Sequence, residues 1–226
     1  MIKILMAEDD PAIQELVDIY LDKQVYQIWF ASDGEETIKM FNDIHPDLLL
    51  VDINMPKKNG IEVCKEIRKT SMIPVLFLSS RDDEKDIIEG LMAGADDYIT
   101  KPFNMNVLLA RIETNVRYKS PNKWVEKPLR LGRLELNFQT FAVKMNGIKV
   151  ELNPRELDLL FYLAAHPNEV IGADKLYEEV WRADSLGDTL TVAVHISRIR
   201  KKVEEDPKNP KIIKTVKGKG YMLAAN

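Results

Sequence analysis

The chain has almost no cysteine, no long apolar run and only a small net charge. Its single cysteine, Cys64, excludes an intramolecular disulfide and a zinc site built on several cysteines. The longest stretch without a charged side chain, which includes residues 71–80, is far shorter than the roughly 20 residues that span a bilayer, so we expect no membrane insertion. One lysine and three acids within the first ten residues interrupt the apolar core that a signal peptide needs. These absences predict a cytoplasmic protein.

What the chain does have is the composition of a folded globular protein. Of its 226 residues, 45% are apolar and 30% are charged, with a net charge of −4. The charge is unevenly divided, because residues 1–117 carry 13 basic and 22 acidic side chains and residues 118–226 carry 19 and 14. Nine basic and three acidic side chains fall within residues 195–226. This division predicts a back half that binds a polyanion, although a solvated basic surface explains the charge alone equally well.

The front half alternates between predicted strands and predicted helices. Pro11 opens the first helix, with Asp10 as its N-cap. Five strands alternating with five helices predict a doubly wound parallel sheet covered on both faces, an α/β fold. The strands are predicted at residues 2–7, 26–31, 48–51, 74–78 and 97–99, and the later helices at residues 33–44, 61–69, 85–93 and 105–117.

The back half has a different pattern and is predicted to be a separate α+β domain. Residues 118–128 contain two prolines and three lysines without an apolar period, which predicts a linker. In the segment that follows, Asn153, Pro154 and Glu156 form a strong helix start. Strands are predicted at residues 133–136, 141–145 and 149–152, further helices at residues 173–181 and 188–205, and a terminal hairpin from residues 212–216 and 221–224.

Acidic side chains follow two of the predicted strands of the front half. Glu8 and Asp9 come directly after the first strand, and Asp52 ends the third. Ligands in open parallel sheets bind at the carboxyl ends of the strands, where neighbouring strands would bring these acids together. Carboxylates at close range repel unless a cation neutralises them, and an all-oxygen site with few protein ligands suits Mg²⁺. The alternative is that these acids are solvated and cap helices, as Asp10 is expected to do.

A hydroxyl and an ammonium group join the same edge of the predicted sheet. Ser79 follows the fourth strand, and Lys101 follows the fifth, directly before Pro102. The lysine would pair with the carboxylates at rest and with an arriving phosphoryl group afterwards. A lysine before a proline is usually only a surface charge, but its place beside the other polar groups of this edge favours a functional role.

Several motifs occur in the order and spacing of a known family. In the front half they are residues 8–10 (EDD), 50–56 (LVDINMP) with Gly60, 78–81 (LSSR) and 94–103 (GADDYITKPF), and in the back half residues 152–160 (LNPRELDLL), 191–202 (TVAVHISRIRKK) and 215–221 (TVKGKGY). The front half resembles a bacterial response-regulator receiver domain, and the back half is similar to the winged-helix DNA-binding domain of the OmpR/PhoB-type subfamily. The resemblance covers nearly the whole chain. It implies a flavodoxin-like receiver (1–117), a linker (118–128) and a winged-helix domain (129–226).

The resemblance implies a role for each residue at the acidic edge. Asp52 resembles the phosphoacceptor, a carboxylate nucleophile toward the phosphohistidine of a sensor histidine kinase. Glu8 and Asp9 resemble the acids that bind Mg²⁺, together with Asp52 and the backbone carbonyl of Asn54. The metal would shield Asp52 from the incoming phosphoryl oxygens.

Three further residues are implied to respond to phosphorylation. Ser79 would hydrogen-bond the attached phosphoryl group and draw its loop inward, which opens space for Tyr98, the family's switch aromatic. Lys101 would pair with a phosphoryl oxygen. The family has a cis bond before the proline of this motif, so we expect a cis Lys101–Pro102 bond.

The last long helix of the back half is apolar on one face and basic on the other, as a helix in the DNA major groove requires. The resemblance implies that base edges are read by Val194, His195 and Arg198 and phosphates by Thr191 and Arg200, while Lys217 and Lys219 reach a minor groove. It also implies that residues 182–187 lie where this fold contacts RNA polymerase. Relatives usually have Arg at Leu190 and Asp at Ala193, so one phosphate contact is expected to be missing.

The resemblance also implies a homodimer through the fourth helix, fifth strand and fifth helix of the receiver. Ile87 stands where the family usually has Lys, and Val107 where that lysine's Glu partner stands. We predict an apolar contact in place of that ion pair, because an exposed ion pair contributes only about 0–1 kcal/mol. The family's other ion-pairing positions are retained as Asp96, Asp97, Arg111 and Arg117.

The leading interpretation is a phosphorylation-activated transcriptional regulator that dimerises and binds promoter DNA, and not an enzyme. An aspartate-nucleophile phosphatase is disfavoured because Asn54 stands where that class has a second Asp. An NTPase is disfavoured because no Gly-x4-Gly-Lys-[Ser/Thr] loop occurs in the sequence. The alternative that stays open is a constitutive DNA-binding regulator whose receiver acts without phosphorylation.

Overall fold

The structure is a computed structural model of the chain, and it describes residues 1–116, 128–138, 140–181 and 189–225. The chain divides into two compact units, Met1–Arg117 and Tyr118–Asn226, which are described one at a time. The predicted linker lies outside the described residues except for Pro128. Among the described helices, none has the length and apolar character that crossing a membrane requires.

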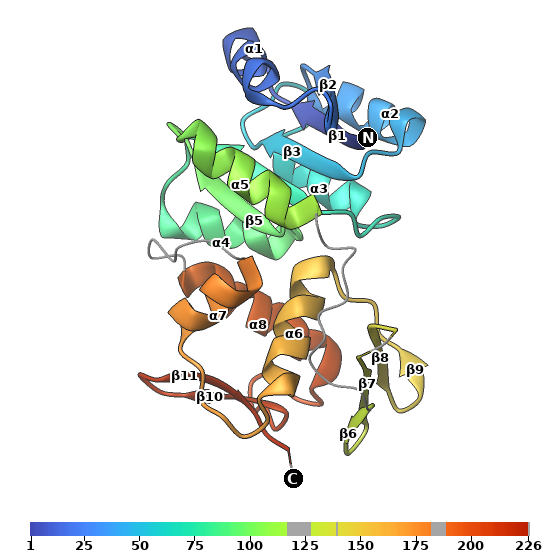
Figure 1. Cartoon of the computed structure of the whole chain (residues 1–226), viewed down its shortest axis with the longest axis vertical. Helices are drawn as coiled ribbons and strands as arrows, with labels where there is room; N and C mark the ends of the chain where they lie inside the picture. The colour runs from blue at the N-terminus through green and yellow to red at the C-terminus, as the bar shows by residue number, and fades with distance from the viewer. Residues whose placement is uncertain (117–127, 139, 182–188, 226) are drawn as a thin grey trace. The chain divides into compact units, whose positions relative to one another are not determined.

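The first unit is a five-stranded parallel sheet with the strand order β2-β1-β3-β4-β5 (Figure 1). This topology confirms the predicted doubly wound α/β fold. Its elements are β1 (Ile2–Ala7), α1 (Pro11–Tyr20), β2 (Tyr26–Ala31), α2 (Gly34–Ile44), β3 (Leu48–Asp52), α3 (Gly60–Ile67), β4 (Val75–Ser79), α4 (Glu84–Ala93), β5 (Asp97–Thr100) and α5 (Met105–Val116).

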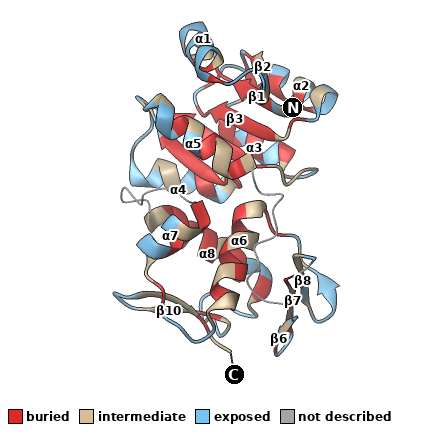
Figure 2. Cartoon of the chain, in the orientation of Figure 1, coloured by how far each residue is buried: buried red, intermediate tan, exposed pale blue. Residues whose placement is uncertain are grey.

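Helices cover both faces of this sheet, which explains why the strands read as continuous apolar runs. Side chains of α1 and α5, among them Val17 and Leu108, pack with Ile4 and Leu50 on one face. Helix α3 contacts its neighbours α2 and α4. Every residue of β3 and β4 is buried, as Figure 2 shows for β3. Short polar side chains start the helices: Asp10 accepts a hydrogen bond from the Ala12 amide, as predicted, at 2.8 Å.

In the residues that the structure describes, the second unit combines a four-stranded antiparallel sheet, three helices and a C-terminal hairpin. The predicted cap of the first helix is confirmed, because Asn153 and Glu156 form a reciprocal capping box. The elements are β6 (Leu129–Leu131), β7 (Leu134–Asn137), β8 (Ala142–Met145), β9 (Ile148–Lys149), α6 (Pro154–Ala165), α7 (Ala173–Trp181), α8 (Thr189–Val203), β10 (Ile213–Val216) and β11 (Gly220–Leu223).

Two strand predictions in this unit differ from the structure. Strand β6 was not predicted, because its three residues are too few to produce an alternating pattern. Of the strand predicted at residues 149–152, Lys149 alone lies in a strand, at the end of β9, because the chain then turns into the cap of α6. The predicted hairpin turn at Asn146-Gly147 is confirmed, with φ of 51° and 79°.

Candidate functional site

Three carboxylates meet at the carboxyl edge of the parallel sheet. The register pairs Ala7 of β1 with Val51 of β3, so Glu8, directly after β1, lies beside Asp52 at the end of β3. One carboxylate oxygen of each of Glu8, Asp9 and Asp52 lies within 4.8 Å of the others. Glu8 and Asp52 are buried and Asp9 is exposed. The predicted acidic cluster is therefore present, with one side open to solvent.

Lys101 pairs with two members of the cluster, as the sequence predicted. Its Nζ donates to Glu8 Oε2 at 2.7 Å and to Asp52 Oδ2 at 2.5 Å. Burial lowers the pKa of Lys101, but the hydrogen bonds to Asp52 and Glu8 outweigh burial and raise the pKa above its ordinary value. For the acid Glu8, burial has the opposite effect and raises the pKa above its ordinary value, although the hydrogen bond and charge of Lys101 lower it. The Lys101–Pro102 bond is cis, which confirms that prediction.

The donor atoms of this cluster fit a divalent cation such as Mg²⁺. Carboxylate oxygens are the hard ligands that Mg²⁺ prefers, and one lysine cannot neutralise three carboxylates. Asp52 Oδ1 accepts a hydrogen bond from the Asn54 amide at 2.8 Å, which fixes the turn that follows the strand. The backbone carbonyl of Asn54 belongs to that turn and remains the predicted fourth ligand.

Ser79 and Tyr98 are joined through Arg81, a residue that the sequence analysis did not single out. The Arg81 amide donates to Ser79 Oγ at 3.1 Å, and the Tyr98 hydroxyl donates to the Arg81 carbonyl at 2.8 Å. Burial raises the pKa of Tyr98, so its hydroxyl keeps the proton that it donates. The Arg81 side chain donates to Asn54 Oδ1 at 2.9 Å. One residue thus links the predicted phosphoryl-binding serine, the predicted switch tyrosine and the turn beside Asp52.

Gly60, the first residue of α3, lies directly against the backbone at the end of β3. A Cβ atom at this position would lie 2.3 Å from the backbone oxygen of Asp52, well inside van der Waals contact. The Gly60 amide also donates to the Ile53 carbonyl at 3.0 Å. The start of α3 therefore packs directly on the backbone that carries Asp52.

Gly60→Ala is expected to lower the free energy of unfolding by about 1–3 kcal/mol, because the added methyl group forces backbone movement at Asp52. It should also slow phosphoryl incorporation at that residue. Thermal unfolding and intact mass after exposure to a phosphoryl donor measure the two effects. Gly172→Ala is the matched control, since its Cβ would meet its nearest neighbour at an ordinary 3.7 Å. Equal behaviour of the two variants would contradict the prediction.

The residues predicted for a dimer surface fall into two groups. Val107 is 36% exposed and Ile87 is half-buried, so both reach the surface of the receiver. Asp97 and Arg111 are buried and form an ion pair at 2.8 Å that joins β5 to α5. Arg117 lies outside the described residues.

Asp96 is placed inside the domain and not on its surface. It has no exposed area, and its Oδ2 accepts from Arg68 Nη2 at 2.7 Å and from the Val75 amide at 2.9 Å. Arg68 also donates to the Gly94 carbonyl at 2.9 Å. The carboxylate therefore stabilises the α3–β4 and α4–β5 connections, and we leave Asp96 out of the dimer surface.

The predicted DNA-reading residues of α8 have partners within their own unit. Arg198 Nε lies 2.7 Å from Glu156 Oε1, a fully buried carboxylate of α6. Arg200 donates to the Ile213 carbonyl at 2.9 and 2.7 Å and to Thr215 Oγ1 at 2.8 Å. Lys202 Nζ also lies 2.7 Å from Glu156 Oε2. The sequence predicted Glu156 only as a helix cap, because its spacing from α8 gives no sign that Arg198 and Lys202 pair with it.

His195 lies in the interior, although the sequence placed it on the DNA-facing surface. Its ring meets the Trp181 ring edge-on at a centroid distance of 5.0 Å, and its Nδ1 lies 2.8 Å from the Thr191 carbonyl. Thr191 and Val194 are also buried. Lys217 and Lys219 are exposed at the tip of the β10–β11 hairpin, as predicted. Residues 182–187, the predicted polymerase contact, lie outside the described residues.

Comparisons with known proteins agree with this arrangement. Residues 4–113 match the response regulator receiver domain, and residues 147–223 match the family described as transcriptional regulatory protein, C terminal. The chain is 40% identical over 223 residues to the uncharacterized transcriptional regulatory protein YcbL of Bacillus subtilis (strain 168). The alignment covers 97% of this chain and 99% of that protein.

Two solved structures, one of a full chain and one of a receiver domain, are similar to this chain. The response regulator DrrB, a Thermotoga maritima OmpR/PhoB homolog, aligns over the whole of both chains with 32% identity and a TM-score of 0.52. The receiver domain of the Francisella response regulator 1452 aligns with 53% of this chain and all of its own, with 32% identity and a TM-score of 0.51.

A doubly wound sheet with this acidic edge, followed by an α+β unit with a basic hairpin, is the organisation of a receiver joined to a transcriptional regulatory domain. The chain belongs to the response regulators of the OmpR/PhoB type. These proteins are transcriptional regulators and do not form an enzyme class.

Proposed function

We propose that this response regulator accepts a phosphoryl group on Asp52 from a sensor histidine kinase, dimerises through its receiver and binds promoter DNA in the cytoplasm. RNA polymerase is its partner in transcription. The observation that carries the proposal is the position of Lys101, which contacts both Glu8 and Asp52 at the acidic edge.

The proposed reaction is a transfer between two protein side chains. A carboxylate oxygen of Asp52 forms a bond to phosphorus while the bond between phosphorus and the histidine nitrogen of the kinase breaks, and that nitrogen keeps the electron pair. Mg²⁺ held by Glu8, Asp9, Asp52 and the Asn54 carbonyl would supply positive charge beside the transferred oxygens. Lys101 provides a second positive charge, because it already contacts Asp52 Oδ2.

The groups that would bind the attached phosphoryl group connect to Tyr98. A phosphoryl oxygen that bonds Ser79 Oγ and Lys101 Nζ draws the β4–α4 loop toward Asp52, because the Arg81 amide is already bonded to Ser79. The Arg81 carbonyl is the hydrogen-bond partner of Tyr98. Phosphorylation would therefore bias the loop and the tyrosine toward one arrangement.

Intact mass spectrometry tests the phosphoacceptor function. The full chain is incubated with a small phosphoryl donor, once with Mg²⁺ and once with a chelator. We expect a gain of one phosphoryl group with Mg²⁺ only. No gain, or a gain that does not depend on Mg²⁺, would overturn the proposed chemistry.

We further propose that phosphorylated receivers pair through α4, β5 and α5. Ile87 of α4 and Val107 of α5 supply apolar area at this surface, and the Asp97–Arg111 ion pair joins β5 to α5 within it. The proposed surface also includes Arg117, which lies outside the described residues. The apolar contact takes the place of an ion pair that salt would screen.

The phosphorylated dimer is therefore expected to dissociate little as the salt concentration rises. Sedimentation equilibrium at low and high salt measures this, with Ile87→Lys/Val107→Glu as the matched variant that restores an ion pair. The double variant should dissociate more at high salt than the wild-type chain does, because its contact is electrostatic. A wild-type dimer that dissociates steeply with salt would contradict the apolar contact.

For DNA binding we propose that α8 lies in the major groove and that the hairpin carries Lys217 and Lys219 to the adjacent backbone or minor groove. Both lysines are exposed. Arg198 would reach a base edge by exchanging its contact with Glu156, so its role in reading bases includes the loss of that ion pair. His195 is left out of the proposed contacts because its ring is buried.

A further inference from the structure

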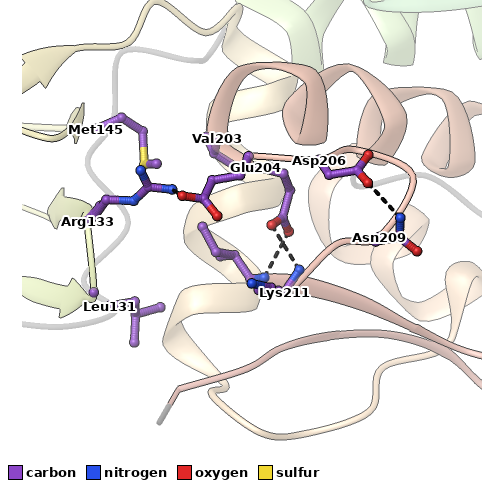
Figure 3. Close-up of a pocket in the computed structure, with 11 residues that line it drawn as sticks. Leu131, Arg133, Met145, Val203, Glu204, Asp206, Asn209 and Lys211 are labelled. Atoms are coloured by element: carbon purple, nitrogen blue, oxygen red, sulfur yellow. Dashed lines mark hydrogen bonds and ion pairs between the residues drawn. The ribbon is translucent and has the colours of Figure 1, made fainter.

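The segment between α8 and β10 is held by one acidic side chain. Glu204 accepts hydrogen bonds from three consecutive backbone amides, from Lys211 at 2.9 Å, Ile212 at 2.9 Å and Ile213 at 2.8 Å. Figure 3 shows its carboxylate turned toward the backbone at Lys211. Hydrogen bonds to a charged acceptor are stronger than neutral ones, so these three bonds attach the start of β10 to the end of α8.

A basic side chain one turn earlier holds the same strand through the carbonyl of Ile213. The Glu204 amide donates to the Arg200 carbonyl at 2.9 Å, which places the two residues one helical turn apart. Arg200 donates to the carbonyl of Ile213, whose amide Glu204 holds, and its guanidinium lies 5.9 Å from the centroid of the Tyr221 ring. We call Arg200 and Glu204 the helix–wing clamp, where the wing is the β10–β11 hairpin.

The wing is attached to its unit through both of its strands. Tyr221 of β11 exchanges two backbone hydrogen bonds with Ile171, each at 2.9 Å, and the clamp holds β10. A cavity of about 430 Å³ is lined on one side by Leu131, Arg133 and Met145 and on the other by Glu204 and Lys211 (Figure 3). The adjoining turn is self-contained, because Asp206 bonds the side chain of Asn209 at 2.6 Å. The position of the β10 backbone against the end of α8 therefore depends on the clamp, while Ile171 fixes β11.

We propose that Arg200 and Glu204 are positioning residues for DNA binding, which set the wing so that Lys217 and Lys219 reach DNA while α8 occupies the major groove. The inference rests on the proposed function of the second unit. Once α8 has bound DNA, a wing held rigidly beside it is at a high effective concentration near its own contact site. A wing that moves freely relative to α8 loses this advantage. It also gives Arg200 a role that differs from the phosphate contact expected from the sequence.

Glu204→Gln in the full chain tests the clamp, because glutamine keeps the size of the side chain and loses its charge. The probe is a short duplex selected by the wild-type protein from a random-sequence library, with binding followed by fluorescence anisotropy. Removing a negative charge should strengthen binding to a polyanion, yet we expect Glu204→Gln to weaken it on the order of tenfold. Glu205→Gln is the matched control, because it removes the same charge from an exposed neighbour that pairs with Arg133 and not with the wing, and it should bind at least as tightly as wild type.

A double-mutant cycle separates positioning from general destabilisation. Lys219→Ala should weaken the wild-type chain but have little further effect on Glu204→Gln, because the wing no longer contacts DNA in that variant. The dependence of affinity on salt should likewise become shallower in Glu204→Gln. Additive effects, an unchanged salt dependence, or binding equal to that of Glu205→Gln would overturn the clamp.

Circular dichroism at the assay temperature shows whether each variant is folded. Arg200→Lys is a second variant that tests the clamp. Arg200→Lys keeps the positive charge available to a phosphate but cannot make the same bonds to Ile213 and Thr215. We expect Lys219→Ala to have little further effect on Arg200→Lys, as on Glu204→Gln, whereas a plain phosphate contact by Arg200 would make the two effects additive. A phosphorylated wild-type chain that selects no duplex would overturn the proposed function itself, while selection followed by additive effects overturns only the clamp.

Discussion

Asp52→Asn is expected to abolish phosphoryl incorporation, the largest effect of any single substitution in this chain. An amide is a poor nucleophile, so removing the carboxylate removes the attacking group. Asparagine has nearly the same shape and keeps an oxygen that can accept the hydrogen bond from the Asn54 amide, so the turn after β3 should survive. Intact mass after incubation with a small phosphoryl donor and Mg²⁺ measures the effect.

Asp43→Asn is the matched control for this substitution. Asp43 is an exposed acid of α2, and its loss changes the net charge by the same amount. The control should gain a phosphoryl group as the wild-type chain does. If Asp52→Asn also gained one, a different residue would be the acceptor and the assignment of Asp52 would be wrong.

Lys101→Met is expected to lower the free energy of unfolding by about 3–5 kcal/mol when Mg²⁺ is absent, because it leaves two buried carboxylates without their cation. Glu8 and Asp52 both lose the Nζ contact, at 2.7 and 2.5 Å. Mg²⁺ should recover part of this stability, since it can neutralise the same oxygens. Chemical denaturation of the variant and the wild type, with Mg²⁺ and with a chelator, measures both effects.

Lys85→Met controls for the loss of an exposed lysine, here on α4. Surface substitutions of this kind usually change stability by less than about 0.5 kcal/mol. If Lys101→Met lost no more stability than Lys85→Met, the ion pairs at the acidic edge would contribute little. If Mg²⁺ stabilised the variant no more than the wild type, the metal and the lysine would not share the same carboxylates.

The receiver half was predictable because its pattern and its chemistry agree. Buried parallel strands produce continuous apolar runs, and the residues that end such strands meet at one edge of the sheet. These two rules predict from the sequence that Glu8, Asp9, Asp52 and Lys101 lie together. The register of β1 against β3 then placed them at contact distance.

The partners of long charged side chains were not predictable in the same way. Asp96 and Arg200 look like surface charges in the sequence, yet Asp96 bonds Arg68 inside the receiver and Arg200 bonds Ile213. The direction of such a side chain is decided by which backbone groups the folded chain brings near it, and a periodic pattern contains no information on that. His195 shows the same limit, because its position on the basic helix did not reveal the Trp181 ring that covers it.

The measurement that tests the central claim most directly is the DNA affinity of one preparation before and after phosphorylation, with Asp52→Asn treated identically. The account predicts that phosphorylation raises the affinity of the wild-type chain for its selected duplex by about tenfold or more, because two receivers then hold two DNA-binding units together, and that Asp52→Asn does not respond. Equal affinity of the wild-type chain in both states would contradict the account and identify the protein as a constitutive DNA-binding regulator.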